Sequence, residues 1–271
     1  MKISNDLSYK AGSVARKIRA KLKLPVNQRL IRFCGIQRTG NHALINWIIA
    51  QEQLETCYIN GAFPGVNPWQ ENWGISYPNF PYWPEERDAR GELVGKELLL
   101  VSYENRPLDE VAADRDDISR YIGVSKSDRC VLVLRDPYNT FASWLKRDTP
   151  VTQAVVDLWK TYAYEFLGKQ NVLGTKVCIS FNEWFLSRDY RCKLAQQLGL
   201  RFTDRGVDVV SHHGGGSSFD GQALKGQTKS MKVLTRYHHY LDNPDFKGIF
   251  EADPELEYLS YEIFGDLPAQ P

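Results

Sequence analysis

The sequence predicts an α/β fold in which a parallel β-sheet is covered by helices on both faces. Short apolar runs alternate with longer segments whose apolar residues recur at helical spacing. The short runs are apolar at nearly every position, as is typical of strands buried on both faces of a parallel sheet. With 271 residues and 42% hydrophobic residues, the chain is long enough to bury such a core in a single domain.

Four strong strands and a weaker one are expected, and helices separate most of them. The strands are predicted at residues 30–33, 97–103, 129–134 and 176–181, with a short one at 57–59. Helices are predicted to start near residue 43 and at Pro137, and to cover residues 108–113, 116–122, 151–167, 184–198 and 255–264.

Composition divides the chain further. Residues 1–28 form a basic N-terminal arm, and residues 29–271 form the α/β domain. Residues 61–90 are rich in Pro, Gly, Asn and aromatics, which predicts a long loop. That loop either forms a wall of an acceptor site or is pinned to the core by its own aromatics. Residues 211–232 are rich in Gly and Ser, which indicates a mobile loop that closes over a ligand.

The net charge of the chain limits the classes of molecule that it is expected to bind. A net charge of +1 argues against a nucleic-acid-binding protein, although residues 8–51 carry nine Lys or Arg and no Asp or Glu. The basic arm is therefore either a solvated helix or a contact with an anionic surface. The absence of an apolar run of about 18 residues predicts that no segment spans a membrane. The five cysteines lack the spacing of a metal site, which favours a reducing, cytoplasmic location.

The segment LIRFCGIQRTGNHALINW, residues 30–47, combines a strand, a glycine turn and a helix start. The N-terminus of a helix presents unpaired N–H groups and a positive dipole, which favours a bound anion, and Arg38 adds a cation. Gly35 and Gly40 have the spacing of a nucleotide P-loop, but Asn41 and His42 replace its Lys-Ser/Thr pair. Without that pair the β/γ-phosphates lose a charge and Mg²⁺ loses a ligand, which disfavours an ATP-dependent kinase.

Two motifs together resemble the sulfotransferase family, whose donor is 3′-phosphoadenosine 5′-phosphosulfate (PAPS). The family's (Lys/Arg)-Ser-Gly-Thr-Thr turn reads here Arg38-Thr39-Gly40-Asn41-His42. Its later strand ending in Arg-(Asn/Asp)-Pro, with a Ser eight residues after the Arg, reads Arg135-Asp136-Pro137 with Ser143. The family's acid/base residue follows a strand between the two motifs, where Glu104 stands here. The C-terminal LKGQTKSMK keeps only part of the family's closing-loop motif, including Lys225 and Gly226.

The resemblance implies a P-loop-like, three-layer sulfotransferase fold and a set of site residues. Glu104, Arg38 and His42 would act in catalysis. The cofactor-binding residues would be Arg38, Thr39, Gly40, Asn41, His42, Arg135, Ser143, Ser217, Ser218, Lys225 and Gly226. Ala43 occupies the position of the family's adenine-stacking aromatic, so Phe219 or an aromatic of the long loop would take that role.

The same resemblance implies the chemistry. The product of the donor would be 3′,5′-adenosine bisphosphate (PAP), no metal would be needed, and the acceptor would be a hydroxyl or amine of a small molecule or glycan. The acidic residues Glu71, Glu85 and Glu86 of the long loop would tolerate a cationic acceptor. Two other classes remain open: a P-loop nucleotide kinase, and a non-catalytic protein that binds adenosine bisphosphate or serves in interactions.

Overall fold

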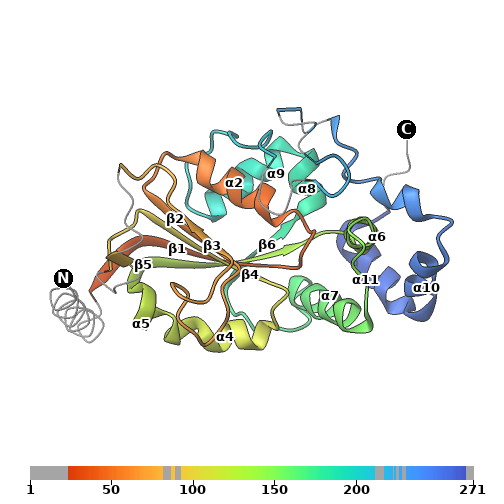
Figure 1. The fold of residues 1–271 in the computed structure, drawn as a ribbon, viewed down its shortest axis with the longest axis horizontal. Coiled ribbons are helices and arrows are strands. Elements are labelled where there is room, and N and C mark those ends of the chain that lie inside the picture. Colours follow the sequence, from red (N-terminus) through yellow and green to blue (C-terminus); the bar gives the residue numbers. More distant parts are fainter. Residues whose placement is uncertain are drawn as a thin grey trace, which may run out of the picture. The chain divides into compact units, whose positions relative to one another are not determined.

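The computed structural model describes residues 24–81, 87, 88, 93–210, 217–221, 223, 226, 227 and 230–266. Six strands form one mostly parallel sheet in the order β3-β2-β4-β1-β5-β6, and helices flank it (Figure 1). The predicted α/β class is therefore confirmed. The chain divides into two compact units. The first contains Met1–Cys34, Gln53–Val131 and Val172–Lys176, and the second contains Gly35–Glu52, Leu132–Asn171 and Val177–Pro271.

Five of the six strands lie where apolar runs predicted them, although β1 and β5 each begin five residues earlier than predicted. Their bounds are β1 (Pro25–Gly35), β2 (Thr56–Asn60), β3 (Gly74–Ser76), β4 (Leu98–Glu104), β5 (Val124–Leu134) and β6 (Lys176–Ser180). The helices are α2 (Asn41–Gln51), α4 (Leu108–Asp117), α5 (Ser119–Ile122), α6 (Pro137–Leu145), α7 (Gln153–Phe166), α8 (Phe181–Leu186), α9 (Arg188–Gln197), the 3₁₀ helix η3 (Arg236–Tyr240), α10 (Pro244–Ala252) and α11 (Pro254–Phe264). None of these described helices is long and apolar enough to cross a membrane.

Other details also differ from the prediction. The single helix expected at residues 184–198 is two helices, because Ser187 has an extended backbone and its side chain caps α9 by accepting from the Tyr190 N–H. The loop predicted after β2 contains the short strand β3. Helix α10 was not predicted; it begins at Pro244, directly after an Asn243 side chain that accepts from the Phe246 N–H.

The predicted N-terminal arm and the Gly/Ser-rich loop are described only in part. Residues 1–23 of the arm lie outside the described residues, and its last residues already belong to β1, which begins at Pro25. Of the Gly/Ser-rich loop, residues 211–216, 222, 224, 225, 228 and 229 lie outside the described residues. The roles expected for these stretches therefore stay predictions.

The first unit contains the paired strands β2, β3 and β4. Strands β2 and β4 run parallel, with Thr56 opposite Leu98 and Ile59 opposite Val101, and β3 pairs antiparallel with β2. Every residue of β4 is buried, which explains its continuous apolar sequence. In this register Asn60, the last residue of β2, is level with Ser102, and β4 continues to Glu104.

The long aromatic loop is held to the first unit by several of its own rings. Trp69 is buried and donates from Nε1 to the Tyr121 carbonyl at 3.0 Å. Tyr77 is buried and donates to Asp88 at 3.1 Å, and Asp88 forms a buried ion pair with Lys96 at 2.6 Å. These contacts support the second of the two alternatives for this part of the loop, namely that its own aromatic side chains hold it to the core. Of the loop's predicted range, residues 82–86, 89 and 90 lie outside the described residues.

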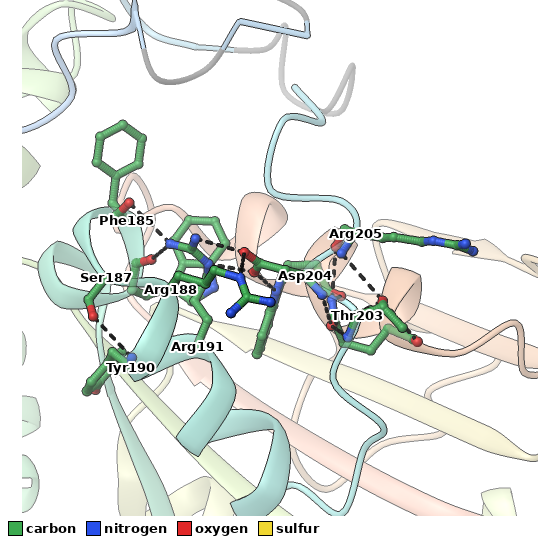
Figure 2. A network of polar contacts seen from close by, with 11 residues as sticks. Phe185, Ser187, Arg188, Tyr190, Arg191, Thr203, Asp204 and Arg205 are labelled. Carbon is green, nitrogen blue, oxygen red and sulfur yellow. Dashed lines mark hydrogen bonds and ion pairs between the residues drawn. The ribbon is translucent and has the colours of Figure 1, made fainter.

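In the second unit, a polar network ties α9 to the segment that follows it and to α2 (Figure 2). Arg191 forms a two-point ion pair with Asp204, at 2.7 and 2.9 Å, and donates to the Trp184 carbonyl at 2.7 Å. Asp204 also accepts from the Trp47 indole of α2 at 3.4 Å. Because its guanidinium is satisfied by a carboxylate and a carbonyl, Arg191 is an arginine with a structural role.

Replacement of Arg191 by Gln is expected to lower the free energy of unfolding by about 3 kcal/mol, because it leaves the largely buried carboxylate of Asp204 without its main partner. Arg188→Gln is the control, since Arg188 lies 3.9 Å from the same carboxylate but is mostly exposed. Its cost should be about 1 kcal/mol or less. Urea denaturation of the two variants measures the difference, and equal losses would contradict the structural assignment.

Candidate functional site

The predicted anion turn joins β1 to α2 in the second unit. Gly40 caps the helix with φ 90° and ψ 20°, and Arg38 also has a left-handed backbone, with φ 68°. Helix α2 then starts at Asn41, and the first N–H groups of a helix have no partner within it. The N-cap residue is Gly40, which has no side chain that could accept from these N–H groups. The turn thus has the backbone of an anion-binding helix start.

Two glycines let the turn close. A Cβ on Gly35 would lie 2.2 Å from Oδ1 of Asn41, and a Cβ on Gly40 would lie 2.1 Å from the ring of Phe181. Asn41 is buried; its amide donates to the Ile36 carbonyl at 3.0 Å, and its Oδ1 lies 2.7 Å from the Thr39 hydroxyl. The Asn41 side chain therefore stabilises the turn by hydrogen bonds within it. Asn41 occupies the position at which a P-loop has its Lys.

Substitution of Gly40 by Ala is expected to lower the free energy of unfolding by about 2 kcal/mol or more. Alanine is strained in the left-handed backbone conformation of this position, and its Cβ would also clash with the ring of Phe181. Gly199→Ala is the matched control. Gly199 has φ 69°, but a Cβ there meets nothing within 4 Å. Chemical denaturation should show the smaller loss for Gly199→Ala, and equal losses would show that Phe181 does not constrain the turn.

Arg135 directly follows β5 and is 2% exposed. Its Nη1 donates to the Arg38 carbonyl at 3.0 Å and, more weakly, to the Ser143 hydroxyl at 3.4 Å, and its Nη2 donates to the Val233 carbonyl. The guanidinium lies 5.1 Å from the ring centre of Phe181. These contacts place the second predicted motif directly against the first.

Arg135 carries a charge that its described neighbours do not neutralise. Within the described part of the chain, no carboxylate lies within ion-pair distance of Arg135, and its Nε has no hydrogen-bond partner. Burial, with the nearby charges of Arg236 and Arg38, lowers the pKa of Arg135 to about 9, although Asp136 acts in the opposite direction. Because an arginine stays protonated in proteins, such a buried cation calls for an anionic ligand.

The segment that follows Arg135 is fixed by a buried network around Asp136 and Asn139. Asp136 caps α6 by accepting from the Asn139 N–H at 2.7 Å and also accepts from the Asn182 amide at 2.9 Å. The Asn139 amide donates to the Leu234 carbonyl at 3.0 Å, and its Oδ1 accepts from the Arg236 N–H at 2.8 Å. The aspartate of the motif therefore fixes α6, and α6 fixes the backbone that carries Arg236.

A short loop at residues 217–221 covers two of the arginines. Ser217 and Gly221 exchange two backbone hydrogen bonds of 3.0 Å. Both Nε and Nη2 of Arg38 donate to the Ser218 hydroxyl, with Nε at 2.9 Å. Arg236 donates to Ser217 at 2.6 Å and pairs with Asp220 at 3.1 Å.

Arg236 completes a cluster of three arginines with Arg38 and Arg135, which we call the arginine cluster. Arg236 is buried, and its pKa is lowered by burial and by the charge of Arg38, while Asp220 acts in the opposite direction. Its guanidinium lies 5.0 Å from the ring centre of Phe219. Of these arginines, Arg236 pairs with Asp220, whereas Arg135 has no carboxylate within ion-pair distance among the described residues.

The structure brings most of the predicted cofactor-binding residues into this one region. Contacts join Arg38, Thr39, Gly40, Asn41, Arg135, Ser143, Ser217 and Ser218 directly or through one intermediate residue. His42 lies in the first turn of α2. Gly226 donates to the Asp208 carbonyl at 3.1 Å, and no described contact joins it to the cluster. Lys225 lies outside the described residues. Sequence reasoning missed Arg236 and Asn139.

Glu104 is the last residue of β4 and is 6% exposed. It belongs to the first unit, whereas the arginine cluster belongs to the second. Burial raises the pKa of Tyr58, and the nearby charge of Glu104 raises it further. The proposed role of Glu104 as a base stays a prediction.

The chain matches no family model and no curated protein. Among solved structures, it is similar to the sulfotransferase domain of an olefin synthase from Synechococcus PCC 7002, with a TM-score of 0.45 and 12% identity over 90% of this chain and 97% of that chain. A likeness at this level carries no argument about function, which must come from the residues themselves.

Proposed function

We propose that this protein is a sulfotransferase that moves a sulfuryl group from PAPS to a hydroxyl or amine. The observation that carries the proposal is the buried Arg135, which has no carboxylate within ion-pair distance among the described residues and lies against the glycine turn. A buried cation of this kind is costly unless an anion neutralises it. PAPS carries a 5′-phosphosulfate and a 3′-phosphate, and would therefore supply one anion to the glycine turn and another to the arginine cluster.

Each of the two motifs would bind a different part of the donor. The N-terminus of α2 and Arg38 would hold the 5′-phosphosulfate, because helix N–H groups and a guanidinium both favour oxyanions. Arg135 and Arg236 would hold the 3′-phosphate. Ser143 donates to the Asn139 carbonyl at 2.7 Å in this structure, so its hydroxyl would turn to reach the phosphate. Phe219, beside Arg236, would offer a ring to the adenine.

The reaction would be an in-line transfer at sulfur. The acceptor oxygen or nitrogen forms a bond to sulfur while the bond from sulfur to the 5′-phosphate oxygen breaks, and that oxygen keeps the electron pair. Arg38 and the helix N–H groups would stabilise the charge on the leaving oxygen. Glu104 would take the proton from the acceptor. The protein's part is therefore alignment and charge stabilisation, and no step in it uses a metal.

The buried Asn41 weakens the kinase alternative. A P-loop uses a Lys at this position to reach the β/γ-phosphates. The Asn41 side chain instead donates to the Ile36 carbonyl inside the turn. A non-catalytic protein that binds adenosine bisphosphate would keep the arginine cluster without needing Glu104.

Transfer assays distinguish these functions. The chain is incubated with PAPS that carries radiolabelled sulfur, together with phenol, amine or sugar acceptors. The proposal predicts labelled acceptor and PAP in equal amounts. Binding of PAP without transfer to any acceptor would favour the non-catalytic protein, and Mg²⁺-dependent turnover of ATP would favour the kinase.

A further inference from the structure

We infer that Asp220 competes with the donor's 3′-phosphate for Arg236, so that its carboxylate holds the guanidinium until the phosphate displaces it. The inference rests on the proposed function, in which Arg135 and Arg236 bind the 3′-phosphate. It names the residue that limits the affinity for PAP. All of these residues belong to the second unit.

The hydrogen bonds of Arg236 show which part of its guanidinium is engaged. Nη2 carries two hydrogens, and it donates to the Ser217 hydroxyl at 2.6 Å and to the Asp220 carboxylate at 3.1 Å. Nε is buried and has no hydrogen-bond partner among the described residues. Both Nη2 hydrogens are therefore used, while another donor of the same guanidinium has no acceptor.

A two-point contact with a phosphate requires a hydrogen of Nη2. A guanidinium binds an oxyanion through two parallel N–H groups, either those of Nε and Nη2 or those of Nη1 and Nη2. Because both arrangements use Nη2, either Ser217 or Asp220 must give up its hydrogen bond. A hydroxyl can turn and donate to the phosphate, whereas an ionised carboxylate only accepts and is repelled by a second anion. Asp220 is therefore the group that leaves.

The Asp220 side chain is held at the surface and not in the core. The Ser217 hydroxyl donates to its carboxylate at 2.9 Å and accepts from its backbone N–H at 3.1 Å. The side chain of Asp220 is 27% exposed, whereas that of Arg236 is 8% exposed. Asp220 can therefore turn toward solvent without burying an unpaired charge.

A phosphate has the stronger claim on the arginines. A phosphate monoester carries a charge of about −1.5 to −2 at pH 7 and has three acceptor oxygens, whereas a carboxylate carries one charge. The phosphate could also accept from Arg135, whose buried Nε likewise has no partner among the described residues and whose pKa is lowered by the charge of Arg236. Competition by Asp220 thus weakens the binding of PAP without preventing it, which would speed the release of this product.

The test compares Asp220→Asn with the wild-type protein by calorimetric titration of PAP and of adenosine 5′-monophosphate. Only PAP has the 3′-phosphate for which Asp220 competes. Asp220→Asn should bind PAP about 10-fold more tightly and dissociate from it more slowly, while its affinity for the monophosphate should change by less than about 2-fold. Asp220→Ala, which removes the acceptor altogether, should change both affinities in the same way.

Asp242→Asn is the matched control, because it removes the same charge from a fully exposed position of the same unit. Both of its affinities should equal those of the wild-type protein. A PAP affinity that is unchanged or weaker in Asp220→Asn and Asp220→Ala would overturn the inference, even if the wild-type protein transfers sulfuryl groups. Selectively tighter PAP binding in a chain that transfers nothing would uphold the inference while the proposed function fails. No binding of PAP to any of these proteins would overturn both.

Discussion

Arg135→Gln is expected to weaken the binding of PAP by about 100-fold or more while changing the stability of the ligand-free protein by only about 1 kcal/mol. The reason is that Arg135 has no carboxylate within ion-pair distance among its described neighbours, so its charge costs free energy until an anion binds. The variant also loses the hydrogen bonds from Arg135 to the Arg38 and Val233 carbonyls, and this loss offsets part of the stability gained by removing the buried charge. Calorimetric titration with PAP and urea denaturation measure the two quantities.

Arg191→Gln supplies the control for this experiment. Arg191 is also a largely buried arginine of the second unit, but Asp204 neutralises it in a two-point ion pair. The two variants should therefore behave in opposite ways. Arg191→Gln should lose stability and keep its affinity for PAP, and Arg135→Gln should keep stability and lose affinity. A large loss of stability with unchanged PAP affinity in Arg135→Gln would show that Arg135 has only a structural role.

Glu104→Gln is expected to lower kcat by about 100-fold or more while leaving the affinity for PAP unchanged, because the amide cannot accept the proton of the acceptor. Glu110→Gln removes the same charge from an exposed position of α4 in the same unit, and its kcat should stay at the wild-type value. Rates are measured at saturating PAPS and acceptor. Unchanged turnover in Glu104→Gln would remove this residue from the mechanism.

The sequence predicted the features of this fold that depend on local patterns. The strand, glycine turn and helix around Arg38 follow from apolar periodicity and from glycines that tolerate a left-handed backbone. Arg135 was found because it stands at the end of an apolar strand and before a proline that opens a helix. Both signals lie within a few residues of the side chain concerned.

The parts that sequence reasoning missed depend on contacts between distant segments. Arg236 joins the arginine cluster through the Asn139 side chain, 97 residues earlier in the chain, and no local pattern marks that pairing. Asn41 was assigned to the ligand, but the structure also gives its side chain a role inside the turn. The break at Ser187 was missed because the helical spacing of apolar residues continues on both sides of it. A serine can end one helix and cap the next.

The affinity for PAP, compared with that for adenosine 5′-monophosphate, tests the central claim most directly. The two nucleotides differ only in the 3′-phosphate, which the arginine cluster is proposed to hold. Calorimetry on the wild-type chain without metal should show PAP binding about 100-fold or more tightly than the monophosphate. Equal affinities, or no binding of PAP at all, would contradict the proposal that this protein uses a donor with phosphates at two places.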